Sequence, residues 1–281
     1  MFCDECHHDV PPSWNSCPHC GRPGLFPNVR AAGQPAEKKA LVRRYHKAKK
    51  AAATRDAGPV LQDFEAAMGR SQAVLARPLG EVERLATSDK QGYATYHQLL
   101  DAGLLLPDGN GWDLLRTLAD DALFTGYKEH IRFAALSLDG VGLSNYGECS
   151  ISFRDDMIAH RASVFVENSA VFMKRRGVKP DQVEKKTRGH RAIWRDRAML
   201  CVAKLGERVQ PATRPDAFGG MLLQQGATGE DDEFVEVHVY GSMTARSFER
   251  VILTKRLRSK ARLRKLREQL GKLDVELQER A

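Results

Sequence analysis

The fold of this 281-residue chain is decided by four consecutive stretches: IRFAALSLDG (131–140), GLSNYG (142–147), ECSISFR (148–154) and RASVFVE (161–167). Alternation is clearest in the third stretch, where Cys149, Ile151 and Phe153 share one face and polar residues share the other. A side-chain period of two is the pattern of a half-buried strand. These stretches therefore predict strands separated by turns, and FVEVHVYG (234–241) predicts one more.

Helical patterns surround these strands. A basic run from Pro35 to about Arg55, rich in good helix formers, predicts an exposed helix. NSAVFMKRRG (168–177) has the capping residues of a short helix, and AIWRDRAMLCVAKL (192–205) predicts a longer one. Residues 79–124 look mainly helical, with a turn at LLLPDGNGW (104–112). We therefore expect an α+β fold with a mixed or antiparallel sheet and flanking helices.

The N-terminus carries a cysteine pattern typical of metal binding. Two Cys-x2-Cys pairs supply four thiol groups: Cys3, Cys6, Cys17 and Cys20. Four thiolates satisfy tetrahedral zinc and leave no open position, so residues 1–24 predict a structural zinc ribbon. His7, His8 and His19 are adjacent alternative ligands. The spacing leaves open whether this module recognises nucleic acid, binds a protein or only caps the fold.

Three further segments are expected after the ribbon. Residues 25–58 predict a linker and the basic helix, residues 59–255 the main α+β domain, and residues 256–281 a basic C-terminal helix. In the last segment a heptad seam is formed by Leu263, Leu266, Leu270, Leu273 and Leu277. The seam allows two interpretations, a homodimer through this helix or packing on the protein's own body.

The charge and hydropathy of the chain restrict its partners and location. The formal net charge is +8, with the excess concentrated near both ends, and this indicates an anionic partner. No segment approaches about 18 consecutive apolar residues, and the chain opens on MFCDEC and not on a basic, then apolar leader. We expect a cytoplasmic protein with no membrane partner.

The strand FVEVHVYG carries the candidate chemistry. Val235, Val237 and Val239 form one face, whereas the other face carries an acid, an imidazole and two aromatic rings: Phe234, Glu236, His238 and Tyr240. A carboxylate beside an imidazole is typical of a strand that faces a cleft. A solvated outer face would show the same alternation, so both interpretations stay open.

A wider succession resembles the second half of bacterial and phage ADP-ribosyltransferase domains. It consists of NYGECSISFRDDMIAHRASVFVENS (145–169), a loop, and FVEVHVYGSMTARSFERVIL (234–253). The resemblance implies NAD as substrate and Glu236 as the catalytic glutamate, which stabilises positive charge while the glycosidic bond breaks. His238 stands where relatives often have Gln, which implies hydrogen bonding or acid–base help.

The same resemblance implies NAD-binding residues. Ser163 would lie on the strand that supports the nicotinamide pocket, and Asn168 and Ser169 at the following helix start. The arginine of the family's first strand is harder to place. Arg77 is our choice, and Arg132 and Arg161 are its rivals.

The acceptor of the ADP-ribose is less defined. Family members that modify arginine carry Gln or Glu two residues before the catalytic Glu, where this chain has Phe234. This departure leaves nucleic acid or another acceptor more open than a protein arginine. The resemblance further implies a toxin or phage-defence effector, with an antitoxin as a partner. The alternatives are a non-enzymatic zinc-ribbon protein that binds nucleic acid and an adaptor that dimerises through the C-terminal heptads.

Overall fold

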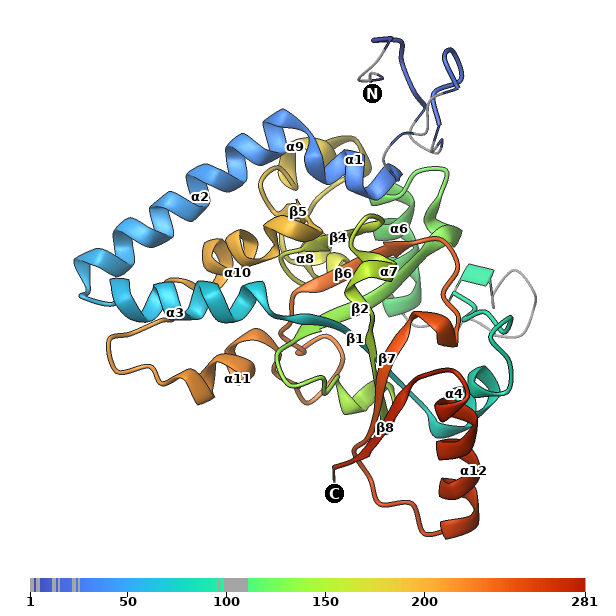
Figure 1. Cartoon of the computed structure of the whole chain (residues 1–281). Coiled ribbons are helices and arrows are strands. Elements are labelled where there is room, and N and C mark those ends of the chain that lie inside the picture. Colours follow the sequence, from blue (N-terminus) through green and yellow to red (C-terminus); the bar gives the residue numbers. More distant parts are fainter. Residues whose placement is uncertain are drawn as a thin grey trace.

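An eight-stranded mixed sheet with helices around it gives the chain the predicted α+β fold (Figure 1). This computed structural model describes residues 3, 6–11, 14, 16–21, 24, 26–95, 97, 98 and 111–280. The strands are β1 (Gln72–Arg77), β2 (Ile131–Ser137), β3 (Cys149–Phe153), β4 (Ala162–Phe165), β5 (Arg191–Ile193), β6 (Glu236–Tyr240), β7 (Phe248–Leu253) and β8 (Glu276–Glu279). Their order is β5-β4-β6-β2-β1-β3-β7-β8, and the β7–β8 pair is parallel whereas the others are antiparallel.

The helices pack on this sheet and on one another. Their bounds are α1 (Pro27–Gly33), α2 (Pro35–Thr54), α3 (Gly58–Gly69), α4 (Leu79–Ala86), α6 (Gly111–Leu123), α7 (Asp155–Ile158), α8 (Ser169–Arg175), α9 (Val183–Lys186), α10 (Arg197–Leu205), α11 (Phe218–Leu222) and α12 (Lys260–Gly271). The basic helix predicted from Pro35 is α2. The predicted capped helix is α8, where the Asn168 side chain accepts hydrogen bonds from the first-turn amides.

One apolar core lies between the sheet and the packed helices α2, α3 and α10, which run side by side in Figure 1. The valine face of β6 is part of it, because Val235, Val237 and Val239 are fully buried. Leu41 of α2 and Phe64 of α3 belong to the same core. The opposite face of β6 carries Glu236 and is directed toward the site described below.

Residues 27–33 form a helix where we expected part of a linker. The Asn28 side chain in α1 donates hydrogen bonds to the carbonyl oxygens of Arg161 and His238, at 3.0 and 2.9 Å. Asn28 is buried, and an unmade hydrogen bond there would cost about 1–3 kcal/mol. These bonds join α1 to β6 and to the residue preceding β4, so this segment is an integral part of the sheet's packing.

The C-terminal segment is not one continuous helix. α12 ends at Gly271, Asp274 adopts a positive φ of 57°, and the chain returns as β8 beside β7. Leu277 therefore lies on a strand and the heptad spacing is interrupted. Leu266 and Leu270 are buried in the main core, so the structure places this part of the seam on the protein's own body.

The long helix predicted over residues 192–205 begins later than expected. Residues 191–193 form β5, which pairs Ala192 with Val164 and extends the sheet edge, and α10 begins only at Arg197. Strand pairing has overridden local helix propensity here. The turn predicted at 104–112 lies almost wholly outside the described residues. Among the described residues, no helix has the length and apolar character needed to cross a bilayer.

Candidate active site

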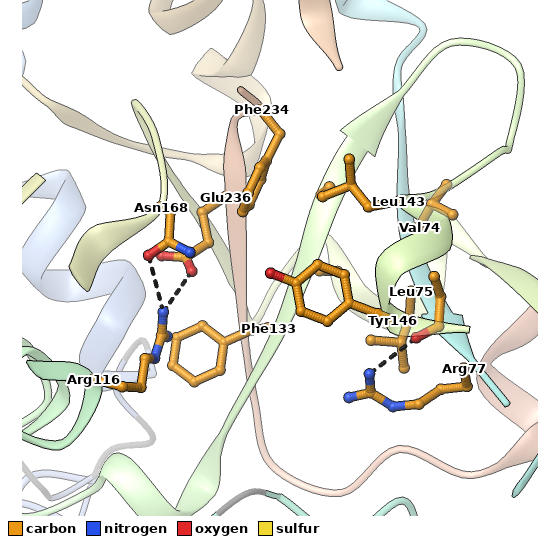
Figure 2. Close-up of a pocket in the computed structure, with 13 residues that line it drawn as sticks. Val74, Leu75, Arg77, Arg116, Phe133, Leu143, Tyr146, Asn168, Phe234 and Glu236 are labelled. Carbon is orange, nitrogen blue, oxygen red and sulfur yellow. Dashed lines mark hydrogen bonds and ion pairs between the residues drawn. The ribbon is translucent and has the colours of Figure 1, made fainter. Parts of the chain in front are cut away.

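A cavity of about 210 Å³ lies over β6, β2 and β1 (Figure 2). In the sheet register, Val74 pairs with Ala135 and Ala135 pairs with Glu236, so these three residues form one row across the strands. Residues in such a row share one face of a sheet. Glu236 and Phe234, which share one face, therefore line this cavity.

Glu236 is held by three hydrogen-bond donors. Arg116 of α6 donates to its Oε1 at 2.9 Å, whereas the backbone amide of Ser169 and the His238 ring nitrogen Nε2 lie 3.0 and 2.8 Å from Oε2. Only 2% of Glu236 is exposed. Burial by itself raises the carboxyl pKa, but the charge of Arg116 and the hydrogen bond and charge of His238 outweigh it and lower the pKa to about 2. The carboxylate is therefore ionised at neutral pH.

The partner of this carboxylate, Arg116, was not predicted from the sequence. Its Nε donates to Asp120 Oδ2 at 3.1 Å, and its guanidinium lies 3.7 Å from the centroid of the Phe133 ring. His97 Nε2 lies 2.9 Å from the same Asp120 oxygen. Two buried carboxylates thus compensate one buried guanidinium, and they raise its pKa despite the burial. The spacing of Arg116 and Asp120, four residues apart on a helix, was a sequence signal for the ion pair but not for its location.

His238 lies behind Glu236 and does not line the cavity. His238 is 3% exposed, and its ring packs edge-on against Phe124 and Phe133, at centroid distances of 4.8 and 5.4 Å. Its contact with Glu236 fixes the carboxylate orientation. A positioning role fits this geometry better than direct acid–base contact with a ligand.

Arg77 lines the cavity on the wall opposite Glu236 (Figure 2). Its Nη1 donates to the carbonyl oxygen of Ala76 at 2.9 Å, its Nε lies 3.5 Å from a carboxylate oxygen of Glu81, and its guanidinium lies 4.6 Å from the Tyr93 ring centroid. Burial lowers its pKa. Ala76, Glu81 and Tyr93 therefore engage part of the guanidinium, whereas its Nη2 makes no hydrogen bond in the described part of the chain and retains donors for a ligand.

The two rival arginines point elsewhere. Arg132 donates to the carbonyl oxygens of His130 and Tyr93, at 3.0 and 3.3 Å. Arg161 donates to those of Tyr240 and Ser242, at 2.8 and 2.7 Å. Neither rival lines the cavity.

The remaining predicted residues divide between the cavity wall and its support. Asn168 lines the cavity, caps α8 and lies 3.4 Å from Nη1 of Arg116. Ser169 contributes its backbone amide to Glu236, and its buried hydroxyl has no partner in the described structure. Ser163 does not reach the cavity, because its hydroxyl accepts a hydrogen bond from Asn28 at 3.2 Å on the strand that supports β6.

Aromatic and apolar side chains complete the cavity. Phe133 and Phe234 lie on the Glu236 side, and Tyr146 extends from the opposite wall with its hydroxyl toward that side (Figure 2). Burial, with the nearby charges of Asp232 and Glu236, raises the pKa of Tyr146 to about 12, so its hydroxyl stays protonated. The cavity therefore combines flat apolar rings with one anionic and two cationic groups.

The Tyr-Gly pair of the turn before β3 has a steric explanation. Gly147 has a φ of 143°, and a Cβ atom there would lie 2.0 Å from the carbonyl carbon of Arg77. Only glycine allows this approach. The turn therefore closes directly against the end of β1 and places Tyr146 beside Arg77.

The N-terminal cysteines form a second candidate site, which could hold a metal ion. Their four sulfur atoms lie within 4.8 Å of one another, and none is in a disulfide. The Cys3–Cys20 and Cys6–Cys17 sulfur distances are 3.7 and 3.5 Å. Tetrahedral zinc with bonds of about 2.3 Å requires sulfur atoms about 3.8 Å apart, so the donor set fits this metal.

Comparison of the chain with protein-family models and with curated proteins finds no match. Its function must be argued from the site itself.

Proposed function

We propose that this protein is an NAD-dependent ADP-ribosyltransferase that holds the nicotinamide-ribose end of NAD in the cavity between Glu236 and Arg77. One observation carries the proposal: a buried, ionised glutamate lies on one wall of a cavity that has an arginine on the opposite wall. The resemblance of residues 145–169 and 234–253 to this family supports the same assignment.

Glu236 has the acceptor capacity that this role needs. A carboxylate offers about four lone-pair sites. Arg116, His238 and the amide of Ser169 occupy three of them. One site on the cavity-lining carboxylate remains for a ribose hydroxyl, and the three protein donors hold the group in place while it accepts that bond.

The proposed reaction breaks the bond between the nicotinamide nitrogen and the ribose carbon. The bonding electrons leave with nicotinamide, and the ribose carbon gains oxocarbenium character. A fixed negative charge in a site of low dielectric constant stabilises that positive charge. A nucleophilic atom of the acceptor then bonds to the ribose carbon and loses the proton it carried. NAD⁺ and the neutral acceptor thus yield the ADP-ribosylated acceptor, nicotinamide and H⁺.

The other cavity residues would bind the rest of the substrate. The guanidinium of Arg77 suits the pyrophosphate because it offers several donors in one plane. The rings of Phe133, Phe234 and Tyr146 suit the flat nicotinamide ring. The cavity is smaller than the ~300–1,000 Å³ typical of complete small-molecule sites, so the adenosine end would extend beyond it.

For the cysteine cluster we propose structural zinc. Four thiolates leave no coordination position for a water or substrate, and metal binding supplies the folding energy of such a small module.

The test measures nicotinamide release from NAD by chromatography, with and without DNA, RNA or protein acceptors. Glu236→Gln should reduce the rate by about 10²–10³-fold, the usual cost of removing one charge-stabilising group. Arg77→Gln should raise KM for NAD. The matched control is Glu233→Gln, because Glu233 lies three residues away, pairs with Arg208 at the surface and does not line the cavity. An unchanged rate in folded Glu236→Gln would refute the proposal.

A further inference from the structure

A cluster of two arginines and a histidine, called here the cationic cluster, lies where α2, the end of α8 and the turn before β5 meet. Arg44 of α2 donates to the carbonyl oxygen of Gly189, and Nη1 of Arg176 lies 3.5 Å from Nε2 of His190. Arg176 is exposed, and Arg44 and His190 are partly exposed. The three side chains therefore form one surface with access to solvent.

This cluster has no acidic partner in the described part of the chain. The nearby Glu37 is engaged by Arg191 and by the amide of Gly189. Burial together with the charges of Arg44 and Arg176 lowers the pKa of His190 to about 3, and burial together with Arg176 lowers the pKa of Arg44. Arg44 and Arg176 thus repel each other and keep His190 uncharged at neutral pH, and a bound anion would offset both effects.

The neighbouring basic residues of the same helix behave differently. Lys174 pairs with Glu230 at 2.6 Å, and Arg175 pairs with Glu167 at 3.1 Å. Among the described contacts, Arg176 therefore differs from Lys174 and Arg175 in having no carboxylate partner, so this is not a property of the whole basic end of α8.

The cluster is built on a rigid support. The Arg176 guanidinium lies 4.4 Å from the centroid of the buried Phe172 ring, and the His190 ring packs edge-on against the same ring at 4.9 Å. Gly189 has a φ of 77°, and a Cβ atom there would lie 2.8 Å from Ala40. The turn that carries His190 is consequently fixed against α2, and the groups are held in place before any ligand arrives.

The cluster lies about one helix length from the proposed active site. The first residue of α8, Ser169, bonds Glu236, and Arg176 directly follows its last residue. Seven helical residues span about 10 Å. Exposed basic side chains lie near these residues in the sequence: Arg43, Lys47, Lys185, Lys186 and Arg188, the last of which lies 4.0 Å from Glu184.

We propose that Arg44, Arg176 and His190 bind one phosphate group of a nucleic-acid backbone. A single free phosphate would use only the cluster itself, whereas the exposed basic residues near it in the sequence match a chain of successive phosphates. If the proposed transferase activity holds, this site would present a nucleic-acid acceptor to the cavity. The binding proposal does not depend on that activity.

The experiment measures binding of a fluorescent single-stranded oligonucleotide to the full-length protein across a salt series. Each phosphate contact contributes about 0.7 to the slope of log K against log salt for single strands, which is about fivefold in affinity between 1 M and 0.1 M salt. Arg176→Gln should therefore lower the slope by about 0.7 and weaken binding about fivefold at 0.1 M salt. Arg175→Gln removes the same charge one residue away, but from a group already paired with Glu167, and should change both quantities much less.

Two outcomes would overturn the proposal. Equal effects of Arg175→Gln and Arg176→Gln would show that only net charge matters. The NMR signals of His190 measure binding of inorganic phosphate. If Arg176→Gln abolished that binding but left oligonucleotide binding intact, the cluster would be a site for a small anion. Because Glu236 takes no part in this assay, its result is separate from nicotinamide release. Thermal unfolding of each variant checks that Arg176→Gln remains folded.

Discussion

Replacing Glu236 by Gln tests the buried charge network independently of any substrate. The pKa of Glu236 is lowered from 4.5 to about 2 in the folded chain. At about 1.4 kcal/mol per pKa unit, its ionisation contributes about 3 kcal/mol to the free energy of unfolding at neutral pH. Because the folded pKa is the lower one, this contribution is fully present above about pH 4.5 and is lost as the pH falls toward 2.

The glutamine variant lacks this titration. The difference in unfolding free energy between the wild-type protein and Glu236→Gln should therefore shrink by about 2 kcal/mol between pH 6 and pH 3. Urea denaturation followed by tryptophan fluorescence at both pH values measures it. Taking the difference between two variants at the same pH cancels the loss of metal from the cysteines in acid.

Glu233→Gln again serves as the control. Glu233 and Arg208 are 41% and 48% exposed, so their ion pair should contribute at most about 1 kcal/mol. If wild-type protein and Glu236→Gln lost stability in parallel as the pH fell, Glu236 would not be an ionised, buried partner of Arg116. The electrostatic basis of the proposed active site would then be wrong.

Two further predictions concern the ends of the chain. Metal analysis should find one zinc ion per chain, and Cys17→Ser should release it, since three thiolates with an open position bind zinc less firmly than four; wild-type zinc content in this variant would contradict the four-cysteine site. Leu270→Ala should lower the free energy of unfolding by about 2–5 kcal/mol, because Leu270 is fully buried in the main core, without changing the molar mass in light scattering. A halved molar mass with unchanged stability would instead favour the heptad dimer.

The strands could be predicted from sequence because burial imposes a period of two on them. The valines of β6 and the alternation of β3 identified both elements, and the Asn168 cap identified the start of α8. The C-terminal leucines misled for the opposite reason. Leu266, Leu270 and Leu277 all pack against the same core, but Leu277 does so from a strand. Leucine spacing alone does not reveal where the helix ends and the strand begins.

The candidate site was only half visible because its two walls come from distant parts of the chain. Glu236 could be singled out by its place on an apolar strand, whereas Arg116 lies 120 residues earlier on a helix, where no local pattern links it to β6. The same holds for the cationic cluster, in which Arg44 meets a turn 145 residues away. A local pattern reports which face of an element is polar, but not what covers that face.

The polar face of β6 is covered by charged partners and by the cavity. A glutamate that is only 2% exposed would ordinarily be protonated, because burying an unpaired charge costs several kcal/mol. Arg116 and His238 keep it ionised, and the carboxylate they hold lies on a cavity wall. An ionised acid maintained at that cost, with one acceptor site still unfilled, fits a group that must meet a positive charge arising in the cavity.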